Sequence, residues 1–409
     1  MTSGAAGAAP FRLGINYLPP EAGMGWLRPY DPERTRSHFR RAAEAGFDSV
    51  RVFLPWEDAQ PTPDVVDPAV LRHLEDTAEA AAEAEVTLIV TLFVGHMSGV
   101  NWAPFWATGG GEGDPRFRVI AGGREITPGS GLRNWYADPD VVAAQERLAG
   151  AAARALAGHP AVWAWDLGNE NSNCTIPPDR RSGESWLERM TAAIRRADPG
   201  RPITAGTHME DLEEDRRMGP AETARYCDFV SMHGYPIYAD WAAGPTDDQL
   251  LPFLSLITRW LASGTDVLFE EFGLPTLPTT DGHDAEPGDP RLVTEPAAAA
   301  YTGRVLDGLR AAGCTGALLW CFADYAPALY ELPPLEVATH ERSFGLWRPD
   351  GSPKPAVAEV TRRVDLPAMP PPALPWLDIG VEEFEADRRG QLIRLYGRYR
   401  ANNWGSRGE

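Results

Sequence analysis

Short apolar segments alternate along the chain with longer segments in which apolar residues recur every three or four positions. The short runs predict buried strands, and the longer period predicts amphipathic helices. The predicted strands are 13–17, 49–54, 87–94, 162–167, 202–205, 229–232, 266–270 and 316–321. The predicted helices between them are 31–45, 68–85, 138–157, 183–197, 247–262 and 295–312. Eight strand–helix units favour an α/β fold, a (β/α)₈ TIM barrel, with a doubly wound sheet as the alternative.

Helix starts and loop lengths add detail to this barrel. Asp31, Asp67 and Asp138 each precede a proline, which pairs an N-cap acceptor with the residue that suits the first helical position. The segments after the third, seventh and eighth strands are long, spanning 95–137, 274–294 and 322–351. In a barrel such loops gather on the C-terminal face, so we expect them to wall a pocket there.

The chain divides into three parts by composition. Residues 1–10 are small and uncharged and predict a flexible N-terminus, 11–365 hold the barrel, and 366–409 begin with a Pro-rich linker. The linker leads to a predicted helix over 381–400, which either packs on the barrel or forms the interface of a homo-oligomer. The start of the chain lacks the pattern of a secretion signal, and no apolar run reaches the roughly 18 residues that span a bilayer, so a cytoplasmic location is expected.

Charge and composition exclude several classes of protein. With 58 acidic and 38 basic residues the formal charge is −20, which disfavours nucleic acid and membrane partners. Lys354, the chain's single lysine, lies between two prolines, which excludes P-loop and Schiff-base chemistry. No HExxH, GxSxG or GxGxxG motif is present, and no cofactor or metal is expected. The cysteines are predicted to be free thiols: Cys174, Cys227, Cys314 and Cys321.

Two carboxyl sites follow predicted strands. Asn169 and Glu170 end the fourth strand, and Glu270 and Glu271 end the seventh. Two carboxyl groups about 5–5.5 Å apart at one end of a barrel would suit retaining glycoside hydrolysis, in which one protonates the leaving oxygen and the other attacks the sugar. The two-residue period of a strand places Glu270 and Glu271 on opposite faces, and it does not choose between them.

The ordered set of strand-end residues resembles glycoside hydrolase family 5, which belongs to a large clan of barrel glycosidases, over about 11–360. The resemblance implies that Glu170 is the acid/base, Glu271 the nucleophile and Asn169 a partner of the sugar 2-hydroxyl. It also implies that Tyr235 touches the nucleophile and that Trp320 forms a floor for the reactive sugar. The full set is Arg51 on the second strand, His96 after the third, Asn169 and Glu170, His233 and Tyr235 after the sixth, Glu271, and Trp320 on the eighth.

These roles carry physical expectations. Arg51 near Glu271 would keep that nucleophile ionised, while Glu170 in a less polar setting would hold its proton. Asp166 lies four residues before Glu170, so its side chain points to the same side of the strand, and it is predicted to support Arg51 from inside the barrel. Three loop tryptophans could stack on sugars or could equally form loop core: Trp102, Trp106 and Trp135.

The segments 14–17, 320–325 and 344–351 look most like the mannan-active members of the family. Together with the expected cytoplasmic location, they predict an exo-acting β-mannosidase whose partner is a small neutral oligosaccharide, mannose linked to mannose or to N-acetylglucosamine. Three alternatives stay open. They are an endo-acting mannanase or β-1,4-glucanase, a sugar-binding barrel without catalysis, and a metal-dependent barrel hydrolase.

Overall fold

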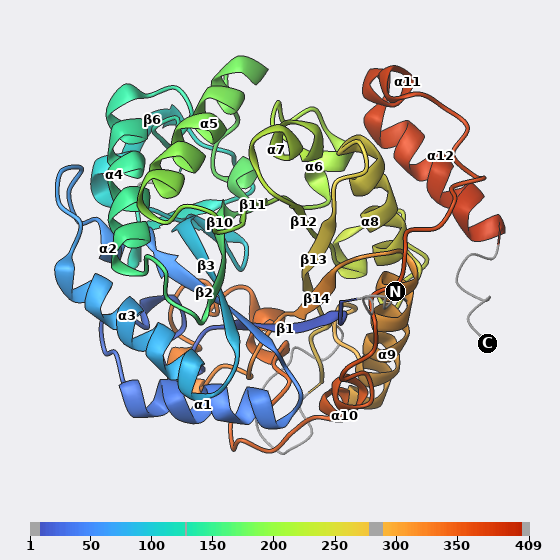
Figure 1. The fold of residues 1–409 in the computed structure, drawn as a ribbon, viewed down its shortest axis with the longest axis horizontal. Helices are drawn as coiled ribbons and strands as arrows, with labels where there is room; N and C mark the ends of the chain where they lie inside the picture. The colour runs from blue at the N-terminus through green and yellow to red at the C-terminus, as the bar shows by residue number, and fades with distance from the viewer. Residues whose placement is uncertain (1–8, 127–128, 278–288, 403–409) are drawn as a thin grey trace, which may run out of the picture.

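Eight parallel strands form the centre of the molecule (Figure 1), in a computed structural model that describes residues 9–126, 129–277 and 289–402. The strands run in the order β11-β10-β3-β2-β1-β14-β13-β12. A parallel bridge between His208 and His233 joins the two ends of this order, so the sheet closes and the predicted barrel is confirmed. The strands are β1 (Arg12–Tyr17), β2 (Ser49–Pro55), β3 (Thr87–Val94), β10 (Val162–Asn169), β11 (Ile203–Gly206), β12 (Val230–His233), β13 (Val267–Phe272) and β14 (Gly316–Leu319).

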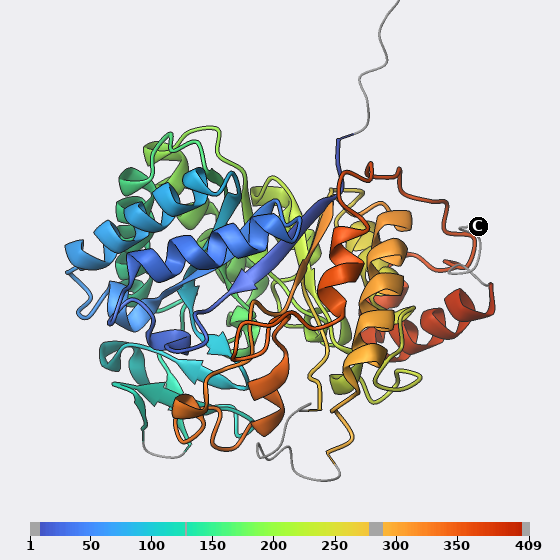
Figure 2. The ribbon, with the colours of Figure 1, turned by 90° about the horizontal axis from the view of Figure 1, so that it is seen from below.

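Helices surround this barrel (Figures 1 and 2). They include α1 (Pro32–Glu44), α3 (Pro68–Glu83), α4 (Pro139–Ala155), α5 (Arg180–Ala197), α7 (Pro220–Tyr226), α8 (Leu250–Leu261), α9 (Glu295–Ala311) and α10 (Ala356–Thr361). Asp31, Asp67 and Asp138 cap α1, α3 and α4 as predicted. The sequence pattern missed α7, because seven residues are too few to show a helical period. Among the described helices, none is long and apolar enough to cross a membrane.

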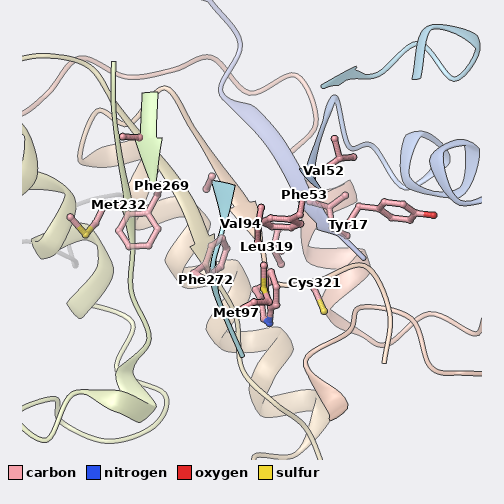
Figure 3. Close-up of a cluster of buried hydrophobic side chains, with 14 of the residues drawn as sticks. Tyr17, Val52, Phe53, Val94, Met97, Met232, Phe269, Phe272, Leu319 and Cys321 are labelled. Carbon is pink, nitrogen blue, oxygen red and sulfur yellow. The ribbon is translucent and has the colours of Figure 1, made fainter. Parts of the chain in front are cut away.

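The barrel strands are buried on both faces, as is usual for parallel sheets covered by helices. Figure 3 shows part of the resulting core, where Phe53, Phe269, Phe272 and Leu319 lie among other apolar side chains. All four are at most 1% exposed. The core therefore gives the strand ends a rigid base, on which polar side chains can be held in fixed positions.

The long segment after β3 contains small sheets that the sequence analysis described as a loop. One sheet consists of β4 (His96–Met97), β5 (Val100–Trp102), β7 (Arg118–Ala121) and β8 (Arg124–Glu125), and β6 (Thr108–Glu112) pairs with β9 (Ser130–Leu132). Figure 2 shows them together at one end of the barrel. These strands have two to five residues, too few to show an alternating pattern, and β6 is mostly glycine. Of the predicted loop after β13, residues 278–288 lie outside the described residues.

The C-terminal segment packs along the outside of the barrel beside α8 (Figure 1). Its predicted helix is divided into α11 (Val381–Ala386) and α12 (Arg388–Ala401) at Asp387, which leaves the helical conformation and caps α12. Trp376, Tyr396 and Tyr399 each pack against the ring of Phe253 in α8. The terminal segments 1–8 and 403–409 lie outside the described residues.

Lys354 is buried and ties together two of the loops on the C-terminal face. Its Nζ donates to Oδ1 of Asp324 at 2.7 Å, to Oγ1 of Thr276 at 2.8 Å and to the backbone oxygen of Ser343 at 3.0 Å. Burial raises the pKa of Asp324 to about 6, although Lys354 opposes this shift. The lysine that the sequence analysis used to exclude other chemistry is thus a structural residue.

Replacing Lys354 with alanine should lower the free energy of unfolding by about 3–5 kcal/mol, because it leaves the carboxylate of Asp324 buried without its charge partner. The loss should be larger at pH 8 than at pH 5, since protonation of Asp324 removes the unpaired charge. Guanidinium-induced unfolding of the wild type and the variant at both pH values measures this loss of unfolding free energy. The Lys354→Met/Asp324→Asn double variant should recover most of the stability, and a double variant as unstable as the single one would contradict this account.

Candidate active site

Glu170 lies immediately after β10 and points into a cavity at the C-terminal end of the barrel. Its backbone has φ 49° and ψ 44°, in the left-handed region, and its N–H donates to the backbone oxygen of Gly206 at 3.0 Å. A non-glycine residue in this region is strained, and such residues concentrate at functional sites. The turn fixes the Glu170 side chain, which is 15% exposed, at the edge of the cavity.

Glu271 lies on β13, deeper in the same cavity, and is 5% exposed. Its Oε1 accepts a hydrogen bond from Nη1 of Arg51 at 2.5 Å, and its Oε2 accepts one from the Tyr235 hydroxyl at 3.0 Å. Glu170, His233 and Glu271 each offer an atom within 4.8 Å of the others, so the two carboxylates face each other at short range. The contact between Tyr235 and Glu271 is the one that the family resemblance implied.

Arg51 is a fully buried cation beneath the cavity floor. Its Nη2 donates to Asp166 at 2.7 Å and to Oδ1 of Asn169 at 2.9 Å, and its Nε lies 3.4 Å from Glu270. Asp166 therefore supports Arg51 as the sequence predicted. A buried guanidinium is tolerated when its charge and its donors are met by carboxylates in this way. Since it also binds Glu271, Arg51 fixes the strand ends of β10 and β13 relative to each other.

Strand alternation predicted that Glu270 and Glu271 lie on opposite faces of β13, and this prediction is wrong. Both form ion pairs with Arg51, at 3.4 and 2.5 Å. The register of β13 shifts against both neighbouring strands, between Phe269 and Phe272 on one side and beside His233 on the other. Such an irregularity re-aims side chains, so two consecutive residues can point toward the barrel interior. Glu271 lines the cavity, whereas Glu270 is fully buried below it.

Three histidines surround Glu170. Nδ1 of His233 lies 3.1 Å from Oε1, Nε2 of His96 lies 3.8 Å from Oε2, and Nδ1 of His208 lies 4.0 Å from Oε2. Although burial lowers the pKa of His233, Glu271 and Glu170 raise it to about 10, so this ring is charged at neutral pH. Burial lowers the pKa of His96.

The sequence expectation that a less polar setting keeps Glu170 protonated is wrong. Burial alone would raise the pKa of Glu170, but His208, His233 and His96 together lower it. Burial raises the pKa of Glu271 against the opposing effects of His233 and Arg51, and the charge of Glu170 raises it further. The directions of the two pKa shifts therefore do not show which carboxyl group is the acid/base and which is the nucleophile. That assignment must come from the positions of the two groups.

The cavity has a volume of about 610 Å³, within the usual range for small-molecule sites. Its walls come from the small sheet after β3, from α6 (Glu210–Glu213) after β11, and from the loop after β14. The predicted site residues that line it are His96, Asn169, Glu170, His233, Tyr235, Glu271 and Trp320. Arg51 lies beneath them. Residues far apart in sequence are thus brought together around the two carboxylates.

The three loop tryptophans do not line this cavity. Trp106 and Trp135 pack edge-on against Trp56, at 5.2 and 4.9 Å between ring centroids, and so belong to the loop core. Trp102 lines a smaller neighbouring pocket of about 140 Å³. The aromatic residues of the main cavity are Phe117, Tyr235, Tyr238, Trp320 and Phe344. Of the two alternatives that the sequence left open for the loop tryptophans, the structure thus shows loop core for Trp106 and Trp135.

Sequence reasoning missed several polar residues of the cavity. The Tyr238 hydroxyl lies 2.7 Å from Nε2 of His340 and donates to Oε1 of Glu341 at 2.8 Å. They form a polar cluster on one wall, in which His340 and Glu341 are buried and Tyr238 is exposed. His340 and Glu341 come from the long loop after β14, where no local pattern marks them. His208, like Glu170, is a polar residue just after a barrel strand, here β11, and the same criterion could have identified it.

The group formed by Glu170, His233 and Glu271 is also the set of described residues that could hold a metal ion. Both oxygens of Glu271 already accept hydrogen bonds, one of them from the cationic Arg51. A metal ion bound there would have to share or displace these contacts of Glu271.

Residues 10–286 match the sequence model of the cellulase family, glycosyl hydrolase family 5. The chain belongs to glycosyl hydrolase family 5. It is also similar to mannan endo-1,4-beta-mannosidase 2 of Oryza sativa subsp. japonica, with 24% identity over 61% of this chain and 60% of the rice protein. The chain thus spans about three fifths of that relative.

Solved structures of family members resemble it over most of its length. A GH5_18 protein from Streptomyces cattleya in complex with GlcNAc gives a TM-score of 0.79 at 24% identity, covering 97% of this chain and 92% of that one. A variant of the same Streptomyces protein has been solved with Manβ1-4GlcNAc. The exo-beta-1,4-mannosidase Op5Man5 from Opitutaceae bacterium strain TAV5 gives a TM-score of 0.69 at 26% identity, covering 89% of this chain and 62% of that one. These similarities extend into the C-terminal segment that the family match does not reach.

Proposed function

We propose that this protein is a retaining, exo-acting β-mannosidase that cleaves short β-mannosides through a covalent glycosyl-enzyme. The observation that carries the proposal is the short separation of Glu170 and Glu271, each of which has a carboxylate oxygen within 4.8 Å of one on the other. Retaining glycosidases place their carboxyl groups about 5–5.5 Å apart, whereas inverting enzymes leave room for a water at about 6.5–9.5 Å.

Position assigns the two roles. Glu271 is the deeper carboxylate, with one oxygen fixed by Arg51 and the other by Tyr235, which suits a nucleophile held against the anomeric carbon. Glu170 is the more exposed of the two, at the cavity edge where the leaving oxygen emerges. His233, whose pKa the two carboxylates raise, lies one hydrogen bond of 3.1 Å from Glu170 and can supply the proton that the acid requires.

The sugar and the mode of attack are supported by the cavity and the relatives. Segments after β3, β11 and β14 wall the cavity, and a walled cavity suits a terminal sugar better than the middle of a polymer. The Streptomyces protein binds Manβ1-4GlcNAc and the Opitutaceae protein is an exo-mannosidase, so a β-mannoside linked to mannose or N-acetylglucosamine is the proposed substrate. A cytoplasmic location, predicted from the sequence, would suit an enzyme of short oligosaccharides.

A panel of nitrophenyl β-mannoside, β-glucoside and β-galactoside tests the sugar, and Manβ1-4GlcNAc and mannohexaose test the mode of attack. We expect rapid release of nitrophenol from the β-mannoside, and free mannose as the first product from both oligosaccharides. Proton NMR of the first product should show the β-anomer, which identifies retention. An α-anomer would contradict the retaining mechanism.

Other products would identify the alternatives. Mixed short oligomers from mannohexaose, without free mannose, would favour the endo-mannanase suggested by the rice relatives. Sugar binding without turnover of any glycoside would indicate a barrel that does not catalyse hydrolysis. Loss of activity in EDTA, restored by added Zn²⁺ or Mn²⁺, would favour a metal-dependent hydrolase, whereas the carboxylate mechanism predicts no change.

A further inference from the structure

The C-terminal helix α12 reaches the active-site cavity, although it lies outside the barrel in sequence and in the fold (Figure 1). Arg389 lines the cavity and pairs with Glu213 of α6 and, at 2.5 Å, with Asp240. Glu213 also accepts from the Trp241 indole at 2.9 Å, and that indole packs edge-on against Tyr396 of α12. The helix and the cavity wall are thus joined at more than one point.

Arg388, next to Arg389, contacts the segment that follows β11. Its Nη1 donates to the backbone oxygen of Asp211 at 2.9 Å, and its Nε and Nη2 donate to Glu385 at 3.0 and 2.5 Å. Arg388 is 8% exposed, so this bond is shielded from water. Glu385 holds the guanidinium in the orientation that reaches Asp211.

Asp211 in turn holds His208 beside Glu170. Its Oδ2 accepts from the His208 backbone N–H at 3.0 Å, and its Oδ1 accepts from the Ser172 hydroxyl at 2.6 Å. The same hydroxyl lies 2.9 Å from Nε2 of His208, which leaves Nδ1 of the ring 4.0 Å from Glu170. The orientation of the histidine therefore depends on the place of Asp211.

We propose that α12 is a functional part of the active site, in which Arg388 is a positioning residue that holds the 208–211 segment so that His208 faces Glu170. The inference rests on the proposed function in giving Glu170 its catalytic role. The charged and titratable groups that face His208 are Glu170, Asp211 and His96. The charge of His208 is one of the influences that lower the pKa of Glu170, so displacement of the ring should raise that pKa.

Arg388→Ala tests the proposal, with Arg394→Ala as the matched control. Arg394 lies on the same helix but pairs with Asp378 on the surface, where both side chains are 38% exposed. We expect Arg388→Ala to lower kcat about tenfold with little change in KM. The limb of the pH–kcat profile that Glu170 controls should move to higher pH. Arg394→Ala should match the wild type in both.

A double variant separates positioning from general loss of stability. If Arg388 acts through His208, the pH shift in Arg388→Ala/His208→Gln should equal that in His208→Gln alone. Additive shifts, or an Arg388→Ala profile identical to the control, would overturn the proposal. Glu385→Gln provides a milder variant if Arg388→Ala does not fold, because it loosens Arg388 without removing it. A Glu385→Gln profile identical to the wild type would then count against the proposal.

The NMR chemical shifts of the His208 ring give a readout that needs no substrate. His208→Gln identifies the ring signal, and we expect its chemical shift to change in Arg388→Ala or Glu385→Gln but not in Arg394→Ala. An unchanged chemical shift would overturn the positioning role even in an active enzyme. A changed chemical shift in a protein that hydrolyses none of the glycosides would retain the contact and reject the proposed function instead.

Discussion

The Glu271→Gln protein should fold and should hydrolyse its best substrate at least about 10⁴-fold more slowly than the wild type. Glutamine has the same shape as glutamate, but its amide cannot attack the anomeric carbon. Arg51 keeps Asp166 and Glu270 as charge partners, so the substitution does not leave it unpaired in the core. Initial rates on an activated aryl β-mannoside, with thermal unfolding run in parallel, measure the effect.

Glu270→Gln is the matched control for this substitution, since the two residues are adjacent and both contact Arg51. Glu270 is fully buried below the cavity, so its replacement should reduce turnover far less than replacement of Glu271. Inactive Glu270→Gln beside an active Glu271→Gln would reverse the assignment. Equal and complete loss in two folded proteins would show that the charge around Arg51, rather than one nucleophile, is what the reaction needs.

Glu170→Ala should have an effect that depends on the leaving group. Hydrolysis of Manβ1-4GlcNAc should fall by about 10²–10⁴-fold, the usual contribution of a general acid. A dinitrophenyl β-mannoside has a leaving group that needs no proton, so its first step should continue and a glycosyl-enzyme should accumulate. A burst of dinitrophenol, followed by slow turnover, measures this behaviour.

Intact-protein mass spectrometry during the burst should show the addition of one hexosyl unit, and peptide mapping should place it on Glu271. The wild type, in which Glu170 activates water for the second step, is the control and should show no comparable accumulation. Equal losses for the disaccharide and the activated mannoside would mean that Glu170 does not protonate the leaving oxygen. A hexosyl unit mapped to another residue would reject Glu271 as the nucleophile.

The sequence by itself favoured the barrel over a doubly wound sheet and indicated the strand ends at which the candidate site lies. Apolar runs, amphipathic periods and the caps at Asp31, Asp67 and Asp138 are local patterns, and each depends on residues only a few positions apart. The polar residues at the ends of β10 and β13 were visible for the same reason. Since parallel strands of a barrel share one C-terminal face, knowing the strand ends was enough to bring Glu170 and Glu271 to the same site.

Only the tertiary structure decided how those residues are oriented and charged. The register shift in β13 directs both Glu270 and Glu271 toward Arg51, which is 220 residues away from Glu271 in sequence. The histidines that lower the pKa of Glu170 arrive from other strand ends, and Arg388 reaches the 208–211 segment from the far end of the chain. Electrostatic energies depend on distance in space and on burial, and a linear pattern records neither.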